Sequence, residues 1–308
     1  MLYLCNRCDA KTFRDNRDLQ RHIDICKLEQ QDIFNKYPTL WKKKRNIIVE
    51  LADFFDVEQD FKYDYMIVFD LEALLHKINE LKGRKLKFLT KHSAVSVSIA
   101  TNAPGFDVKE EFILSENPKE LTKMMFKYFD DVADRAREMM LIKMLPLIRK
   151  IDKHYNEGEI KQYFHLIEEY CSSIPIVGFN TGFYDTNLLM DEGFLNEILA
   201  RDREPFVIKD GKRYKVIKTN RFIFLDQMNY CAADTDLRKF IKAYDVGEEK
   251  GHFPYEWFDD YSKLDFLVQD LSIDNFDSSL KNSKLSQKEF DSLMQTCKEQ
   301  NLITVRDL

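Results

Sequence analysis

Tyr65-Met-Ile-Val-Phe-Asp70-Leu-Glu72 is the stretch of sequence that decides the fold. Its five consecutive bulky residues predict a strand buried on both faces. Side chains alternate along a strand, so Asp70 and Glu72 point to the same side, with backbones roughly 6.5–7 Å apart. This spacing suits two divalent cations about 3.5–4 Å apart, which clamp both oxygens of an in-line phosphoryl displacement. Solvated acids at a turn are the alternative, and the rest of the chain decides between the two.

Composition limits the classes of protein to be considered. The chain has 308 residues, which suffices for one large domain or two modest ones. We find no apolar run of about 18 residues and no leader sequence, so we expect neither a membrane-spanning nor a secreted protein. The six cysteines form no disulfide framework, which favours a reducing compartment. Net charge is −6, with a basic head and an acidic body, so nucleic-acid binding would rest on local patches.

The head of the chain carries four potential zinc ligands in the order C-x2-C-x13-H-x3-C: Cys5, Cys8, His22 and Cys26. Between the pairs lie Phe13 and Leu19, the two apolar residues that a minimal ββα core needs. Asp15 or Asn16 would cap the helix. The order resembles a C2H2-type zinc finger with cysteine as last ligand. The alternative is four unrelated residues at a chain terminus.

The sequence predicts three regions: a C2HC zinc finger over 1–27, a polar and partly helical linker over 28–60, and a domain over 61–308. Lys42-Lys-Lys-Arg45 in the linker would serve nuclear import or be simply solvated charge. In the domain, strands alternate with helices, which predicts an α/β fold. After the first strand we expect helix or turn over 71–82, followed by a basic run (Lys82, Arg84, Lys85, Lys87, Lys91). Strands are expected over 92–101 and 112–114. A long helix capped by Asn117, with a potential break at Pro146, should follow, and then a helix over 160–171 and a strand over 175–179.

A second chemical motif follows that last strand. Gly178-Phe-Asn180-Thr-Gly-Phe-Tyr184-Asp185 predicts a glycine-containing turn that leads into a helix with Asp185 in its first turn, and Gly193 is a plausible stop for that helix. An N-x2-3-(F/Y)-D motif after a D-x-E strand resembles the 3′–5′ exonuclease domain of family B DNA polymerases. The resemblance implies a ribonuclease H-like mixed sheet flanked by helices. It further implies that Asp70, Glu72 and Asp185 hold two Mg²⁺ (or Mn²⁺) ions, and that Asn180 and Tyr184 contact the substrate.

Later stretches narrow the resemblance to protein-primed family B polymerases. A hairpin on Asp210-Gly211 leads to a strand over 222–226 that ends in an acid, then to Asp236-Leu237-Arg-Lys-Phe240 and Lys250-Gly-His-Phe253. By resemblance, Leu237 and Phe240 grip single-stranded DNA and Lys250 assists catalysis. Asp236 stands where the family has Ser or Thr, although the neighbouring Thr235 could substitute for it.

The family's third exonuclease motif is Y-x3-D. Tyr261-Ser-Lys-Leu-Asp265 has this spelling but comes too early, directly after the Lys250 element. We therefore expect the domain to be truncated before its last motif, and the activity of this chain to be correspondingly reduced. No D-x2-S-L-Y-P is present, so the polymerase palm is not expected here.

These motifs together imply the exonuclease portion of a protein-primed DNA-directed DNA polymerase, which removes 3′-terminal nucleotides by two-metal hydrolysis during replication. The implied partners are single-stranded DNA, a primer 3′ end and a terminal protein primer, with Zn²⁺ in the finger and no membrane. The implied location is the nucleus, or the cytoplasm for a viral or plasmid element. The alternatives are a stand-alone two-metal DNA or RNA exonuclease and a zinc-finger DNA-binding protein with an inactive exonuclease fold.

Overall fold

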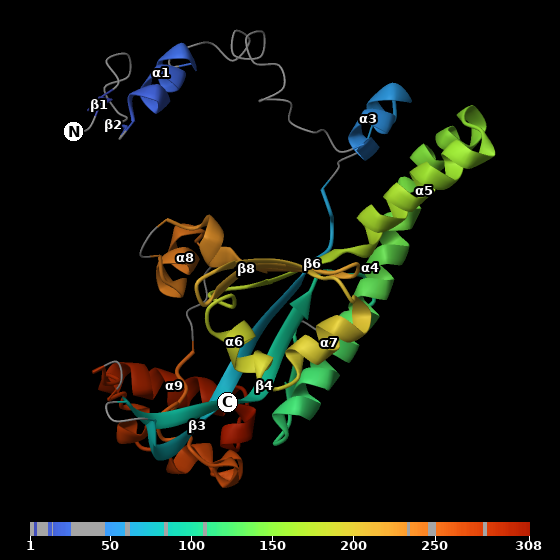
Figure 1. The fold of residues 1–308 in the computed structure, drawn as a ribbon. Coiled ribbons are helices and arrows are strands. Elements are labelled where there is room, and N and C mark those ends of the chain that lie inside the picture. Colours follow the sequence, from blue (N-terminus) through green and yellow to red (C-terminus); the bar gives the residue numbers. More distant parts are fainter. Residues whose placement is uncertain are drawn as a thin grey trace. The chain divides into compact units, whose positions relative to one another are not determined.

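The computed structural model describes residues 3–4, 12–13, 15–25, 47–58, 62–82, 86–106, 110–232, 235–245, 251–279 and 282–308. The chain divides into two compact units, Met1–Gln59 and Asp60–Leu308. The elements of both are labelled in Figure 1. In the described part of the chain, no helix is long and apolar enough to cross a membrane.

The first unit has the predicted ββα order. β1 (Tyr3–Leu4) pairs antiparallel with β2 (Thr12–Phe13), and α1 (Asn16–Ile25) follows. The Asp15 carboxylate accepts a hydrogen bond from the Arg17 amide at 2.8 Å, which confirms the predicted cap. His22 lies on α1, whereas Cys5, Cys8 and Cys26 lie outside the described residues. A second helix, α3 (Ile47–Phe54), lies in the stretch predicted to be a partly helical linker.

The second unit is built on one seven-stranded mixed sheet with the order β5-β4-β3-β6-β9-β8-β7. The strands are β3 (Ile67–Lys82), β4 (Leu86–Thr101), β5 (Glu111–Leu114), β6 (Ile174–Gly178), β7 (Phe206–Asp210), β8 (Arg213–Lys218) and β9 (Phe222–Asp226). β3 runs antiparallel to β4 and parallel to β6, which is parallel to β9. β7 and β8 form the predicted hairpin, with Gly211 at φ +59° in its turn. The sheet confirms the predicted α/β class and is consistent with a ribonuclease H-like exonuclease fold.

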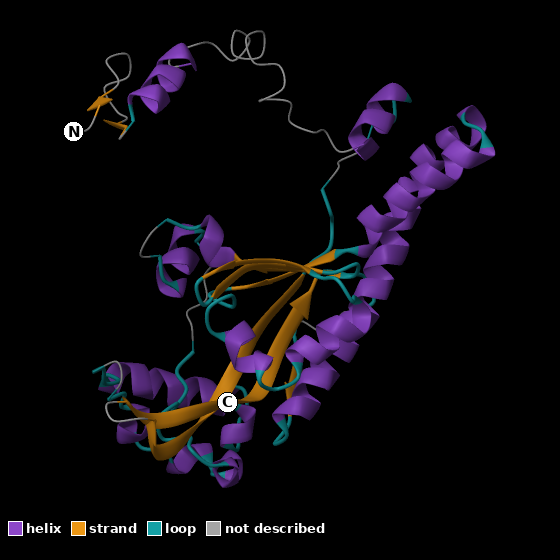
Figure 2. Ribbon diagram, viewed as in Figure 1, coloured by secondary structure: helices purple, strands orange, loops and turns teal. Residues whose placement is uncertain are grey.

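Helices flank this sheet (Figures 1 and 2). They are α4 (Pro118–His154), α5 (Glu157–Ser172), α6 (Asp185–Met190), α7 (Phe194–Arg201), α8 (Leu237–Ala243) and α9 (Gln287–Glu299). α4 begins as predicted, because the Asn117 side chain accepts hydrogen bonds from the amides of Lys119 and Glu120. The C-terminal segment adds short 3-10 helices: η2 (Tyr261–Asp265), η3 (Val268–Asp270), η4 (Ile273–Phe276) and η5 (Val305–Asp307), while η1 (Gln227–Tyr230) follows β9.

Two predictions of secondary structure are wrong. Residues 71–82 form no helix or turn but continue β3 to a length of 16 residues, paired along its length with β4. The pattern was misleading because Leu74 is buried by the C-terminal segment, so apolar residues occur on both faces of the strand. The helix over 118–154 does not break at Pro146. Met144, Leu147 and Ile151 are fully buried on both sides of that proline, and their burial offsets its cost of about 3 kcal/mol.

The long β3–β4 pair contributes to two hydrophobic cores. The sheet core includes Ile67, Phe69 and Leu71 of β3 together with residues of α4, α7, β6 and β9. The outer core consists of Leu74, Val95, Phe258, Leu264, Leu271 and Val305. β4 carries a bulge at this boundary, because Glu72 pairs with Ser96 while Ala73 pairs with Ala94, which leaves Val95 as the extra residue.

Candidate active site

The acidic pair lies on β3 where the two cores meet. Phe69 and Leu71 are buried in the sheet core, whereas Asp70 is exposed and Glu72 is half-buried on the opposite face. Opposite Asp70 and Glu72 in the register of β4 stand Ser98 and Ser96. Since serines are small, they leave space beside the two carboxylates.

The loop after β6 is held in one conformation by close backbone contacts. A Cβ on Gly182 would lie 2.0 Å from the Tyr214 carbonyl oxygen, and one on Gly178 would lie 2.0 Å from Thr181 Cγ2. Asn180 has φ +65°, in the left-handed region. The loop therefore requires glycine at two positions for reasons of space.

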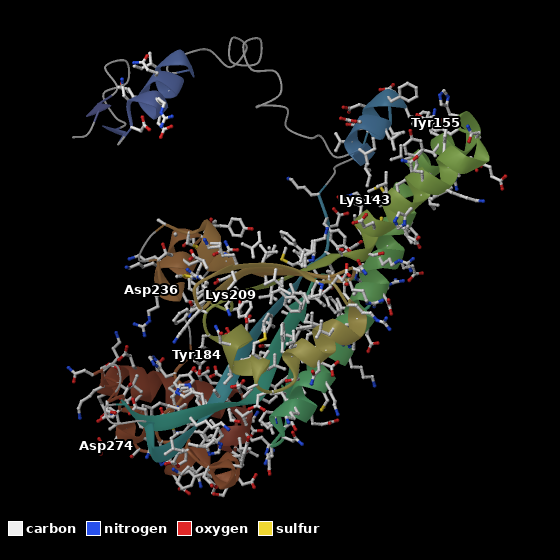
Figure 3. All side chains as sticks on the ribbon, in the orientation of Figure 1. Lys143, Tyr155, Tyr184, Lys209, Asp236 and Asp274 are labelled. Carbon is white, nitrogen blue, oxygen red and sulfur yellow. The ribbon has the colours of Figure 1, made fainter. Side chains whose placement is uncertain are left out.

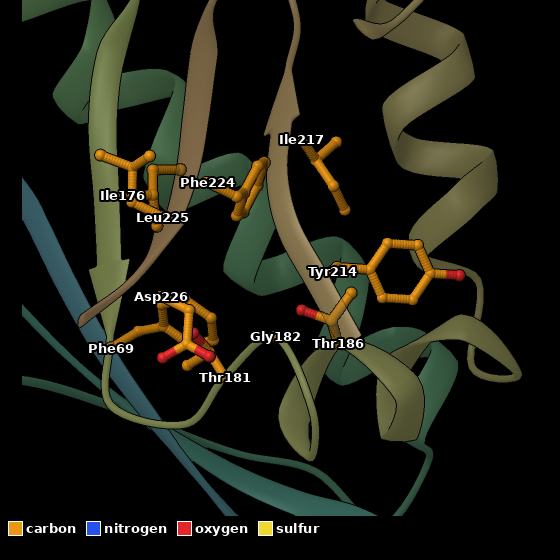
Figure 4. A pocket seen from close by; sticks show the side chains of 10 residues that line it. All are labelled: Phe69, Ile176, Thr181, Gly182, Thr186, Tyr214, Ile217, Phe224, Leu225 and Asp226. Atoms are coloured by element: carbon orange, nitrogen blue, oxygen red, sulfur yellow. The ribbon is translucent and has the colours of Figure 1, made fainter. Parts of the chain in front are cut away.

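Asp226, the acid at the end of β9, holds this loop in place through hydrogen bonds. It is 1% exposed and accepts hydrogen bonds from the amides of Asn180 and Met228, both at 2.9 Å. It also pairs with Arg213 at 3.1 Å. Figure 4 shows its carboxylate near Thr181 and the turn at Gly182, among the residues that line a narrow pocket next to the loop. Asp226 thus has a structural role, and its hydrogen bonds position Asn180.

Asp185 is the first residue of α6 and is 3% exposed. The neighbouring Tyr184 lies close to all three predicted metal ligands. The pKa of Tyr184 is raised to about 12, mainly by burial and then by the negative charges of Asp185, Glu72 and Asp70 in that order. Carboxylates of two motifs far apart in the sequence therefore act on one phenol through their charge.

Tyr255 is a site residue that we did not single out from the sequence. Its hydroxyl donates a hydrogen bond to Glu72 Oε1 at 3.1 Å. Its pKa is raised by burial and by the charge and hydrogen bonding of Glu72, with smaller contributions from Asp70 and Tyr184. The signal available in the sequence was an aromatic residue next to Pro254, five positions after Lys250.

His92 is the second residue that sequence reasoning missed. Its Nδ1 lies 2.8 Å from the Tyr184 hydroxyl oxygen, and the two rings meet edge to face with centroids 5.8 Å apart. Burial lowers the pKa of His92. In the sequence, it was only the first residue of a predicted strand.

The predicted DNA-gripping element forms α8. Asp236 caps this helix, accepting a hydrogen bond from the Lys239 amide at 2.8 Å. Phe240 packs against Phe179, next to Asn180, with ring centroids 5.6 Å apart. Leu237 lies half-buried on the same helix. In the view of Figure 3, Tyr184 lies between Asp236 and Asp274 of the C-terminal segment.

The other predicted residues have varied surroundings. Lys250 lies outside the described residues, as do the side chains of the basic run except Lys91, which is exposed. Phe253 packs on Tyr255 and Phe258 beside the outer core. Tyr261 faces His76 at a ring distance of 6.3 Å, and Asp265 pairs with Arg306 at 2.9 Å.

Within the described ranges, no three His, Cys, Asp or Glu side chains stand together as a ready-made metal cage. Magnesium rarely needs such a cage, because it retains several waters and binds to one or two carboxylates plus substrate phosphates. The oxygen donors of Asp70, Glu72 and Asp185 fit such an ion by their chemistry.

Comparison with known proteins gives a distant likeness. No family model matches the sequence, and no curated protein matches it significantly. Among solved structures, the chain is similar to a family B DNA polymerase from the hyperthermophilic archaeon Pyrobaculum calidifontis, with 15% identity and a TM-score of 0.37. The similarity covers 67% of this chain and 22% of the polymerase chain.

Proposed function

We propose that the unit Asp60–Leu308 is a 3′–5′ exonuclease that removes terminal nucleotides from single-stranded DNA. One observation carries this proposal: β6 runs parallel to β3, so the loop with Tyr184 and Asp185 follows β6 at the same edge of the sheet where Asp70 and Glu72 follow the start of β3. Acids beside an exposed aromatic ring are suited to divalent cations and to a nucleotide.

Asp70, Glu72 and Asp185 would hold the cations, Mg²⁺ or Mn²⁺. When bound, these ions would lower the pKa of the attacking water and stabilise the leaving 3′-oxygen. Burial of Asp185 strengthens its attraction for a cation, since charges interact more strongly away from water. Tyr255 holds one oxygen of Glu72 in place by its hydrogen bond.

Contacts with the single-stranded DNA would come from side chains on the loop after β6 and on α8. Tyr184 is 38% exposed and the adjacent Phe183 is 55% exposed, so both offer faces on which a base can stack. Asn180 would contact the 3′ end, and Leu237 and Phe240 would flank the strand. Lys250 would assist catalysis.

We further propose that this exonuclease serves a protein-primed DNA-directed DNA polymerase in replication, in the nucleus or in the cytoplasm, with a terminal protein as partner. The order of its sequence motifs supports this.

The first unit would bind Zn²⁺ through Cys5, Cys8, His22 and Cys26. Its ββα order and the cap at Asp15 support this assignment. Measuring the zinc content of the purified chain, with Cys8→Ser as comparison, tests it.

The proposed activity is tested by incubating the full chain with Mg²⁺ and single-stranded oligonucleotides labelled at either end. The expected result is stepwise release of nucleotides from the 3′ end, lost on adding a chelator and reduced at least about a hundredfold by Asp185→Asn. Asp152→Asn, an exposed acid on α4, is the matched control. DNA binding without hydrolysis would instead favour a DNA-binding protein with an inactive exonuclease fold.

A further inference from the structure

His92 and Tyr184 form a contact that the exonuclease motifs do not explain. His92 lies on β4, opposite Leu75 of β3 and beyond the bulge, whereas Tyr184 lies in the loop before α6. The imidazole Nδ1 and the phenol oxygen are 2.8 Å apart, within hydrogen-bond distance. β4 and the loop before α6 are thus linked by a direct side-chain contact.

The tautomer of His92 decides whether the phenol or Nδ1 supplies the hydrogen in this bond. A tyrosine hydroxyl keeps its proton at neutral pH, because its ordinary pKa is about 10. Burial lowers the pKa of His92, so its imidazole is neutral there and one ring nitrogen is an acceptor. The carboxylates act on Tyr184 through charge, whereas its hydroxyl is hydrogen-bonded to His92.

The second phenol at the site is oriented in the opposite way. Tyr255 donates its proton to Glu72, so its oxygen belongs to the acidic cluster. With His92 Nδ1 as the acceptor, Tyr184 instead donates its proton away from that cluster. Its remaining lone pair can therefore accept a hydrogen bond from an incoming O–H group, which carboxylates without protons cannot supply.

We propose that His92 is a positioning residue that engages the Tyr184 proton and so presents the Tyr184 oxygen as an acceptor for the 3′-terminal hydroxyl of a bound strand. This assignment rests on the proposed exonuclease function. The hydrogen bond between the Tyr184 oxygen and the 3′-hydroxyl forms in the bound substrate as well as in the transition state. Its loss therefore raises KM and leaves kcat little changed.

The experiment measures kcat and KM for nucleotide release by the full chain with His92→Phe, Tyr184→Phe and the double variant. Removing one neutral hydrogen bond should raise KM about five-fold in each single variant, with no further increase in the double variant. His92→Asn should restore most of the affinity, because its amide oxygen can replace Nδ1 as acceptor. His165→Phe, on the exposed face of α5, is the control and should not change KM.

Two further measurements separate this assignment from the general function. With an oligonucleotide lacking the terminal 3′-hydroxyl, wild type and His92→Phe should have equal KM values. Imidazole nitrogen NMR should show Nδ1 without a proton, with a chemical shift that changes in Tyr184→Phe.

Additive effects of His92→Phe and Tyr184→Phe, a protonated Nδ1, or a KM difference that persists without the hydroxyl would overturn the assignment while leaving exonuclease activity intact. A wild-type chain that releases no nucleotide would overturn both. Thermal unfolding of each variant confirms that it is folded.

Discussion

The sheet core and the outer core share the strands β3 and β4 but are built in different ways. The sheet core is closed by regular helices and contains a cluster of aromatic rings, in which Phe126 meets Phe129, Phe194 and Phe222 edge to face. The outer core is closed by 3-10 helices and irregular segments around Phe258 (Figure 2). One pair of strands thus supports both a regular and an irregular layer.

The candidate active site lies where these two cores meet. The sheet core positions Asp70, Glu72 and the loop before α6, whereas the outer core positions Tyr255 against Glu72. The two cores therefore have different roles. The sheet core supports the strand and loop that carry the predicted acids, and the outer core holds Tyr255, which is hydrogen-bonded to Glu72.

The largest expected effect concerns the sheet core. Phe126 is fully buried and contacts four other phenylalanines, so Phe126→Ala should lower the free energy of unfolding by about 3–5 kcal/mol. Urea denaturation followed by circular dichroism measures this loss. Phe266→Ala, whose ring is 38% exposed, is the control and should cost less than about 1.5 kcal/mol. Equal losses for the two variants would contradict the assignment of Phe126 to the core.

A somewhat smaller effect is expected in the outer core. Phe258→Ala should cost about 3 kcal/mol, because the ring is fully buried but its irregular surroundings can collapse into part of the cavity. Hydrogen exchange should rise in residues 251–308 and stay unchanged in β6 and β9 if the cores open separately. A uniform rise across both cores would show that they unfold as one unit.

A third prediction isolates the link between the cores. Tyr255→Phe removes a hydrogen bond to a charged acceptor, which contributes about 1.5–3 kcal/mol in buried settings. We expect a modest loss of stability and a lower affinity for Mn²⁺, measured by titration calorimetry. Tyr230→Phe, on an exposed ring, is the matched control. Unchanged Mn²⁺ affinity in Tyr255→Phe would mean that Glu72 needs no support from the outer core.

The smallest expected effect is a dependence of stability on pH. Burial lowers the pKa of His92 in the folded chain, so the unfolded chain binds this proton more readily. The stability that neutral His92 contributes is therefore fully present above about pH 6.5 and is lost as pH falls through the lowered folded pKa. The Tm of the wild type should fall more between pH 7.5 and 5.5 than that of His92→Phe. Parallel curves for the two proteins would rule out this contribution.

The same contrast explains which parts of the molecule could be predicted from the sequence. The sheet core arises from local patterns: an apolar strand before Asp70, a capped helix after Asn117 and an Asp-Gly hairpin, and all three elements were predicted. The prediction that the strand is buried on both faces is wrong, because Val68 is 42% exposed on the face opposite Phe69. The outer core depends on contacts between distant segments. Because the burial of Leu74 comes from residues beyond 251, no local pattern distinguishes the second half of β3 from a helix.

The residues of the candidate site also fall into a group that the sequence predicted and a group that it did not. Asp70 and Glu72 could be named because their spacing has a chemical meaning, and Asp185 because its motif resembles one of family B polymerases. Tyr255 and His92 could not, since each is defined by one long-range hydrogen bond, to Glu72 and Tyr184 respectively. Asp226 was noticed only as the acid at the end of a strand. Its burial and its bond to the Asn180 amide show a supporting role that the sequence does not reveal.

The central claim is that acids on β3 and α6 form one cation-binding site. Mn²⁺ binding followed by electron paramagnetic resonance tests this directly in the wild type, Asp70→Asn and Asp185→Asn. We predict that the wild type binds Mn²⁺ and that either substitution weakens binding at least about tenfold, because each removes a carboxylate ligand of the same site. Asp152→Asn should bind like the wild type. Absence of Mn²⁺ binding by the wild type, or normal binding by Asp185→Asn, would contradict the claim.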